Sequence, residues 1–205
     1  MTWVVVPVKR FSLGKSRLAS VLGERERKRF ATRLFDHAIE SVLAVDGLSG
    51  VLVVTDCAEV EVRAHAAGAD AIVDEAASTI GEAVRIGLGR VTDRGAARAL
   101  VLMTDLPLLH PSDVVAMLAA LETGDVAVAP DTRDVGTNAL ALRTPLAMDT
   151  LFGTGDSFPR HLAEARRKGL REAIVRAPGL LFDVDTPDDY RRFLALSGCR
   201  EAVIG

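Results

Sequence analysis

Short apolar runs alternate with longer amphipathic stretches along this 205-residue chain, and this alternation is its strongest constraint on fold. Eight runs are predicted strands: Trp3–Val8, Val51–Thr55, Ala71–Val73, Leu100–Met103, Val126–Ala129, Ala139–Leu142, Ala173–Val175 and Leu180–Phe182. Six stretches are predicted helices: Glu24–Val45, Ala58–Ala67, Thr79–Val91, Ser112–Leu121, Phe158–Lys168 and Pro187–Leu196. Strands and helices at this spacing build a mainly parallel sheet between helices, the α/β class. Because no repeat or long linker interrupts the pattern, a single domain over residues 1–205 is predicted.

Composition argues against two classes of protein. The formal net charge is −3 and the pI is about 5.8, which is unlike a general nucleic-acid or membrane-surface binder. No apolar run approaches the roughly 20 residues that a spanning helix needs, and the chain enters its first predicted strand without a leader-type segment. Cys57 and Cys199 lack the spacing of a metal site. We therefore expect a soluble cytoplasmic protein with reduced thiols, acting on small molecules.

Three aspartates lie just beyond predicted strands that are far apart in the sequence. Asp105 follows the run that ends at Met103, and Asp183 and Asp185 follow Leu180–Phe182. Open α/β folds hold ligands at the carboxyl edge of the sheet, and the Asp-x-Asp spacing puts both carboxylates on one side of an extended segment. Because Mg²⁺ binds one or two carboxylates together with substrate phosphates, these residues predict a Mg²⁺ site for phosphoryl or nucleotidyl transfer. The alternative is that they only cap turns and helices, although Asp183 has no local capping role.

A basic loop follows the first predicted strand. Its segment Gly14-Lys15-Ser16 is like part of a phosphate-binding P-loop, but that motif needs a glycine where this chain has Lys9. A short helix is predicted to open near Ser16, and free N–H groups at a helix start favour anions. In a chain of net negative charge this loop suits a triphosphate, with a solvated basic loop as the alternative. The charges are those of Lys9, Arg10, Lys15 and Arg17.

The segment between Pro130 and Phe158 is rich in glycine, threonine and aspartate, as expected of a loop region that builds a site. Within it, Gly136-Thr137-Asn138 precedes an apolar strand and offers an N–H, a hydroxyl and an amide together. Further on, Gly153 and Gly155 allow close backbone approach, and Ser157 begins a helix, which together suit a phosphate or carboxylate. The alternative is a glycine turn with a serine cap. His161, one turn into this helix, is expected to pack rather than face the site.

Taken together, these motifs resemble those of the 2-phospho-L-lactate guanylyltransferase family of coenzyme F-420 biosynthesis, which includes phosphoenolpyruvate guanylyltransferases. The matching stretches are Val-Pro-Val-Lys with Gly-Lys-Ser-Arg-Leu, Asp105–Leu109, Pro130–Leu140, Phe152–Gly155 with Ser157, and Asp183–Asp189. The resemblance covers nearly the whole chain. It implies a three-layer Rossmann-like fold of the nucleotide-diphospho-sugar transferase type, with a homodimer left open.

The resemblance also implies an activity and its residues. The reaction would transfer GMP from GTP to 2-phospho-L-lactate, phosphoenolpyruvate or 3-phosphoglycerate, with Mg²⁺ as cofactor and pyrophosphate as the second product. The implied roles are nucleotide binding by Lys9, Lys15, Ser16, Arg17 and Glu82, Mg²⁺ binding by Asp105, Asp183 and Asp185, acceptor binding by Thr137, Gly153, Gly155 and Ser157, and catalysis by Lys15, Asp105 and Asp183.

The family often has Pro-Ala where this chain has Met103-Thr104 before Asp105. Two further departures leave the base and the acceptor open. Glu82 stands where an asparagine is common, and Asp156 is inserted between Gly155 and Ser157. An added carboxylate beside an anionic acceptor is unfavourable unless a cation such as Arg160 compensates for it. The alternative functions are nucleotidyl transfer to a molybdopterin or a sugar phosphate, and nucleotide binding without catalysis.

Overall fold

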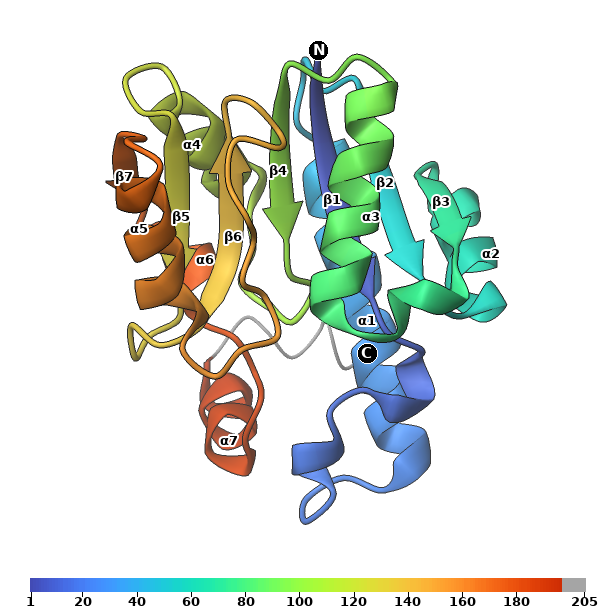
Figure 1. Cartoon of the computed structure of the whole chain (residues 1–205). Helices are drawn as coiled ribbons and strands as arrows, with labels where there is room; N and C mark the ends of the chain where they lie inside the picture. The colour runs from blue at the N-terminus through green and yellow to red at the C-terminus, as the bar shows by residue number, and fades with distance from the viewer. Residues whose placement is uncertain (197–205) are drawn as a thin grey trace.

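Seven of the eight predicted strands form one twisted sheet in the computed structural model, which describes residues 1–196 (Figure 1). The strands are β1 (Thr2–Val8), β2 (Gly50–Thr55), β3 (Asp70–Val73), β4 (Arg98–Leu102), β5 (Val126–Pro130), β6 (Thr137–Leu142) and β7 (Glu172–Ile174). Their order across the sheet is β3-β2-β1-β4-β6-β5-β7. Only β6 pairs antiparallel with its neighbours β4 and β5, so the sheet is mainly parallel, as predicted.

Helices cover both faces of the sheet and complete three layers. All six predicted helices form, and the full set is α1 (Glu24–Leu43), α2 (Ala58–Ala67), α3 (Ile80–Asp93), α4 (Pro111–Ala120), α5 (Ser157–Arg167), α6 (Pro178–Leu181) and α7 (Pro187–Ala195). Three 3₁₀ turns are η1 (Phe11–Leu13), η2 (Ser16–Leu18) and η3 (Glu75–Ser78). The helices α1, α2 and α4 pack on one face, and α3 and α5 pack on the other, in front of the sheet in Figure 1.

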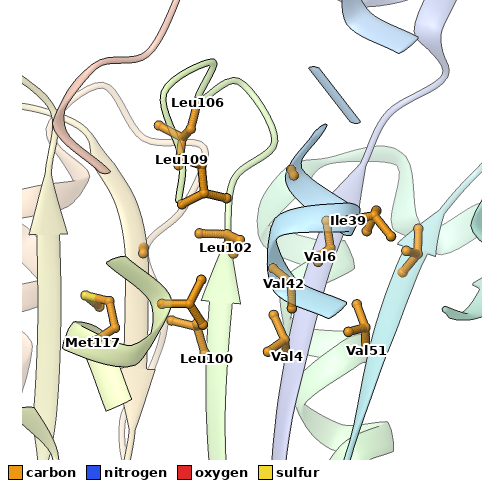
Figure 2. Close-up of a cluster of buried hydrophobic side chains, with 14 of the residues drawn as sticks. Val4, Val6, Ile39, Val42, Val51, Leu100, Leu102, Leu106, Leu109 and Met117 are labelled. Carbon is orange, nitrogen blue, oxygen red and sulfur yellow. The ribbon is translucent and has the colours of Figure 1, made fainter. Parts of the chain in front are cut away.

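The central strands are buried on both faces because their side chains alternate between two cores. Val4 and Val6 of β1 point toward α1 and lie among the buried side chains of Figure 2. Val5, between them, belongs to the core under α3. There Gly87 allows a close approach of helix to strand, because an added Cβ would lie 2.4 Å from Val5 Cγ1. Burial on both faces explains why these strands read as continuous apolar runs.

The prediction of a strand at Leu180–Phe182 is wrong, because Leu180 and Leu181 belong to the short helix α6 and Phe182 follows it. Pro178 occupies the first turn of α6, a position that favours a helix start. Gly179 lies so close to the loop before α4 that an added Cβ would be 2.4 Å from the Leu108 carbonyl oxygen. The Leu180 carbonyl then accepts a hydrogen bond from Asn138 Nδ2 at 2.8 Å, instead of pairing in the sheet.

The chain beyond α6 still reaches the carboxyl edge of the sheet. The Val184 N–H donates to the Asp105 carbonyl at 3.1 Å, which places the Asp-x-Asp segment beside the loop that follows β4. Because β6 is antiparallel, its first residue, Thr137, lies at this same edge. Leu18, Phe182 and Phe193 belong to a small apolar cluster that joins η2, α1 and α7 below the sheet in Figure 1.

No helix within residues 1–196 is long and apolar enough to cross a membrane. Cys57 is a free thiol. Residues 197–205, including Cys199 and the end of the predicted domain, lie outside the described part of the chain.

Candidate active site

A cavity of about 820 Å³ opens at the carboxyl edge of the sheet. Its walls come from the loops after β1 and β4, the start of β6, the loop before α5 and the segment after α6. Ten of the predicted site residues line it: Lys9, Lys15, Arg17, Asp105, Thr137, Gly153, Gly155, Ser157, Asp183 and Asp185. The structure thus brings together side chains separated by more than 170 residues in sequence.

Three carboxylates converge on one side of the cavity. One oxygen from each of Asp105, Asp183 and Asp185 lies within 4.8 Å of the others. Partial burial, together with the charges of Asp105 and Asp185, raises the pKa of Asp183 from 3.8 to about 7. Asp105 Oδ1 is buried and has no hydrogen-bond partner among the described residues.

This donor set fits a hard divalent cation. Such ions prefer carboxylate oxygens, and three of these point to one place. The buried, unpartnered oxygen of Asp105 is a group that a cation would satisfy. A nearby dication would also favour the ionised form of Asp183, which the two neighbouring carboxylates disfavour.

Lys15 lies between two of these carboxylates. Its Nζ is 3.1 Å from Asp105 Oδ2 and 3.0 Å from Asp185 Oδ1. Burial lowers the pKa of Lys15, but the charges of Asp105 and Asp185 outweigh burial and hold it above its ordinary value. Burial acts to raise the pKa of Asp185, but the charge and hydrogen bond of Lys15 outweigh burial, so this pKa lies below its ordinary value. The ammonium of Lys15 is therefore charged at neutral pH.

The backbone of the basic loop turns sharply at Lys15, which has a left-handed φ of +55°. Arg17 is largely exposed, with one Nη 3.8 Å from Asp185, so it is free to reach a phosphate in the cavity. Lys9 lines the cavity as well. Arg10 instead pairs with Asp56 at 3.1 Å. The loop thus supplies three cations to the cavity.

Two of the predicted nucleotide residues lie outside the lining of the cavity. Ser16 begins the three-residue turn η2. Glu82 forms the capping box of α3, where its carboxylate accepts hydrogen bonds from the Thr79 N–H and the hydroxyls of Thr79 and Ser78. These bonds lower the pKa of Glu82. The departure from the family pattern at Glu82 thus has a local structural role at the start of a helix.

A second group of cavity-lining residues offers hydroxyls and backbone N–H groups. We call Thr137, Gly153, Gly155 and Ser157 the acceptor wall, because the sequence predicts that they bind the acceptor substrate. Ser157 is buried at the start of α5, and its Oγ accepts the Thr137 N–H at 2.9 Å. Gly153 has φ +84°, a conformation that side chains with a Cβ rarely adopt. The inserted Asp156 lies 3.7 Å from Arg160, so its charge has the compensating partner that the sequence suggested.

One residue that sequence reasoning left out, and one that it expected to pack, also belong to this region. Asp131 lines the cavity and is almost fully buried, and its Oδ1 accepts the N–H groups of Arg133 and Val135. Its position directly after β5, at the same edge as Asp105, was the available signal. His161 is fully buried and contacts Thr137, as expected for a packing residue, but no local pattern marked that contact.

The fold is a mainly parallel α/β sheet, and its carboxyl edge carries a carboxylate cluster, a basic loop and the acceptor wall. This combination defines a nucleotidyltransferase. Solved structures agree on the fold. A Desulfovibrio desulfuricans G20 protein assigned as a nucleotide-diphospho-sugar transferase superposes with a TM-score of 0.79 at 18% identity, covering 98% of this chain and 90% of that one. Rv0371C of Mycobacterium tuberculosis H37Rv, solved in complex with manganese, has a TM-score of 0.52 at 26% identity over 93% and 96% of the chains.

The chain belongs to the family described as guanylyl transferase CofC like, which it matches over residues 2–199. A phosphoenolpyruvate guanylyltransferase of Sphaerobacter thermophilus is 40% identical over 188 residues, covering 92% of this chain and 90% of the relative. A 3-phospho-D-glycerate guanylyltransferase of Phenylobacterium zucineum is 34% identical over 178 residues, or 85% and 81% of the two chains. The resemblance seen in the sequence motifs is thus confirmed, together with the predicted fold class.

Proposed function

We propose that this protein transfers GMP from GTP to a small phosphorylated carboxylic acid and releases pyrophosphate, as a step of coenzyme F-420 biosynthesis. The observation that carries the proposal is one cavity whose lining combines a carboxylate cluster, three cations and the acceptor wall. Such a cavity suits two anions that meet over a metal ion. The relatives named above act on phosphoenolpyruvate and 3-phosphoglycerate, and 2-phospho-L-lactate has the same pair of anionic groups.

The reaction forms one bond and breaks one. A phosphate oxygen of the acceptor attacks the α-phosphorus of GTP, and the bond from that phosphorus to the β,γ-diphosphate breaks in line. The attacking oxygen is already anionic, so no side chain has to remove a proton. Catalysis then rests on orientation and charge rather than on a covalent intermediate.

The side chains divide into three roles in this proposal. Asp105, Asp183 and Asp185 would hold Mg²⁺, which neutralises charge on the reacting phosphates when bound. Lys15 pairs with two of these carboxylates and would supply positive charge near the α-phosphate. Lys9 and Arg17, which also line the cavity, would bind the outer phosphates. The acceptor wall binds the phosphate and carboxylate of the second substrate. The proposal also places the enzyme in the cytoplasm and includes a homodimer, both carried by the family alone.

The test is pyrophosphate release with Mg²⁺, for each of the four nucleoside triphosphates against phosphoenolpyruvate, 3-phosphoglycerate and 2-phospho-L-lactate. Release with GTP and at least one acceptor is expected, and Asp105→Asn should lose it by at least 100-fold while keeping its melting temperature. Release with another nucleotide would correct the base. No release with any pair, while GTP still binds, would contradict the proposal and favour nucleotide binding without this catalysis.

A further inference from the structure

His161 connects the acceptor wall to the backbone behind it. Its imidazole is fully buried on α5. On one side, Nε2 accepts the Leu151 N–H at 2.8 Å. On the other side, Nδ1 lies 2.9 Å from Thr137 Oγ1. Both ring nitrogens are therefore engaged, and each contact constrains the position of a proton.

The Leu151 contact determines which tautomer His161 adopts. A nitrogen that accepts an N–H must present a lone pair, so Nε2 carries no proton. The neutral ring then has its proton on Nδ1, which donates to the Thr137 hydroxyl oxygen. Burial, with a smaller effect of the nearby Arg160 charge, lowers the pKa of His161 to about 4. The ring is thus neutral at physiological pH, in agreement with this geometry.

The same reasoning orients both hydroxyls of the acceptor wall. The Thr137 oxygen accepts from His161, and the Ser157 oxygen accepts the Thr137 N–H. Each hydroxyl therefore has a protein donor on its oxygen and keeps its own proton for another partner. Within residues 1–196, neither hydroxyl donates a hydrogen bond to a protein acceptor, and both residues line the cavity.

We propose that His161 is a positioning residue that fixes the Thr137 hydroxyl as a hydrogen-bond donor to an anionic oxygen of the acceptor substrate. This inference rests on the proposed function, which places the acceptor against Thr137. It extends the role of His161 beyond packing, because the hydrogen bonds from Leu151 to His161 and from His161 to Thr137 determine the direction in which the Thr137 hydroxyl donates. Two hydroxyls whose protons are free to donate favour a phosphate or carboxylate, whose oxygens only accept, over an uncharged hydroxyl in the same place.

Two substitutions separate the two halves of this chain of bonds. His161→Asn places an amide NH₂ near the position of Nδ1, so it retains a donor for Thr137. His161→Gln extends its amide toward the position of Nε2, so it can accept from Leu151 but does not donate to Thr137. We expect His161→Gln to raise the KM for phosphoenolpyruvate about tenfold with the KM for GTP unchanged, and His161→Asn to stay within about threefold of wild type.

A double variant shows whether the effect passes through Thr137. In a Thr137→Val background, His161→Gln should raise the phosphoenolpyruvate KM no further. An additional tenfold rise in that background, or an equal rise in both KM values, would overturn the inference. Melting temperatures of all variants identify any that fail to fold.

Nitrogen NMR of the wild-type imidazoles tests the same point without turnover. We expect a protonated Nδ1 and an unprotonated Nε2 for His161, with the Nδ1 signal shifting when phosphoenolpyruvate is added. The opposite tautomer, or a signal that phosphoenolpyruvate leaves unchanged, would overturn the inference even if the variants misfold. Wild type that gives the expected spectra but no pyrophosphate would overturn the proposed function alone.

Discussion

His161 makes the stability of this protein depend on pH in a direction that the structure determines. Its folded-state pKa is about 4 because the ring is buried, against 6.5 in the unfolded chain. Between these two values the unfolded state binds a proton that the folded state does not, so the free energy of unfolding falls as pH falls through this window. Above pH 6.5 the contribution is fully present, and below about pH 4 it is lost.

The size of this contribution follows from the same two pKa values. A shift from 6.5 to about 4 corresponds to about 3 kcal/mol in total, and about 2 kcal/mol of it is lost between pH 8 and pH 5. The side chain has no solvent exposure, so solvent screening does not reduce the figure. His161→Asn removes the titrating group. The stability difference between wild type and this variant should therefore be about 2 kcal/mol smaller at pH 5 than at pH 8.

Urea unfolding, followed by the fluorescence of the single tryptophan, Trp3, measures this difference at both pH values. All other groups titrate in both proteins, so their contributions cancel in the comparison. Ser157→Ala is the matched control, because it alters the same hydrogen-bond network without removing a titratable side chain, and its effect should be equal at pH 5 and pH 8. A wild-type to His161→Asn difference that is the same at both pH values would refute the reasoning.

Three further outcomes are expected. Asp183→Asn should raise the melting temperature at pH 8 in EDTA by at least about 2–4 °C, because the folded pKa of about 7 means that ionised Asp183 destabilises the fold as pH rises from 4 to 7. A lower melting temperature of the variant at pH 8 would contradict the raised pKa. Lys15→Met should reduce kcat/KM for GTP at least 100-fold, since Asp105 and Asp185 lose their shared cation; activity within threefold of wild type would contradict that role. Ser157→Ala should raise the acceptor KM about tenfold and leave the GTP KM unchanged, and an equal rise in both would remove Ser157 from the acceptor wall.

The fold was largely predictable because its strands are buried on both faces and its helices carry strong start signals. Val4 and Val5 point into different cores, so β1 has an unbroken apolar sequence, which is typical of a strand buried on both faces. Leu180–Phe182 was assigned wrongly for the opposite reason. Three apolar residues fit a buried strand and a buried helical turn equally well, and the packing of Gly179 that decides between them is not visible in sequence.

The site was predictable where chemistry is concentrated in short motifs, and less so where it depends on pairing between them. Asp105 and Asp183 stand out because each follows an apolar run, and the structure brings them together even though only one of those runs is a strand. The contact between Thr137 and His161 joins β6 to α5 across 24 residues without any repeating pattern. Glu82 has a role that the family pattern did not indicate, since its carboxylate caps the start of α3.

Phosphorus NMR of the enzyme with Mg²⁺, GTP and phosphoenolpyruvate tests the central claim most directly. Guanylyl transfer predicts that free pyrophosphate appears together with a new pair of mutually coupled phosphorus signals, from the acceptor phosphate joined to GMP. The Asp105→Asn variant should give neither signal. If GTP is instead cleaved to GDP and inorganic phosphate, or if the α-phosphate of GTP is never joined to the acceptor, the account of this cavity as a guanylyl-transfer site is contradicted.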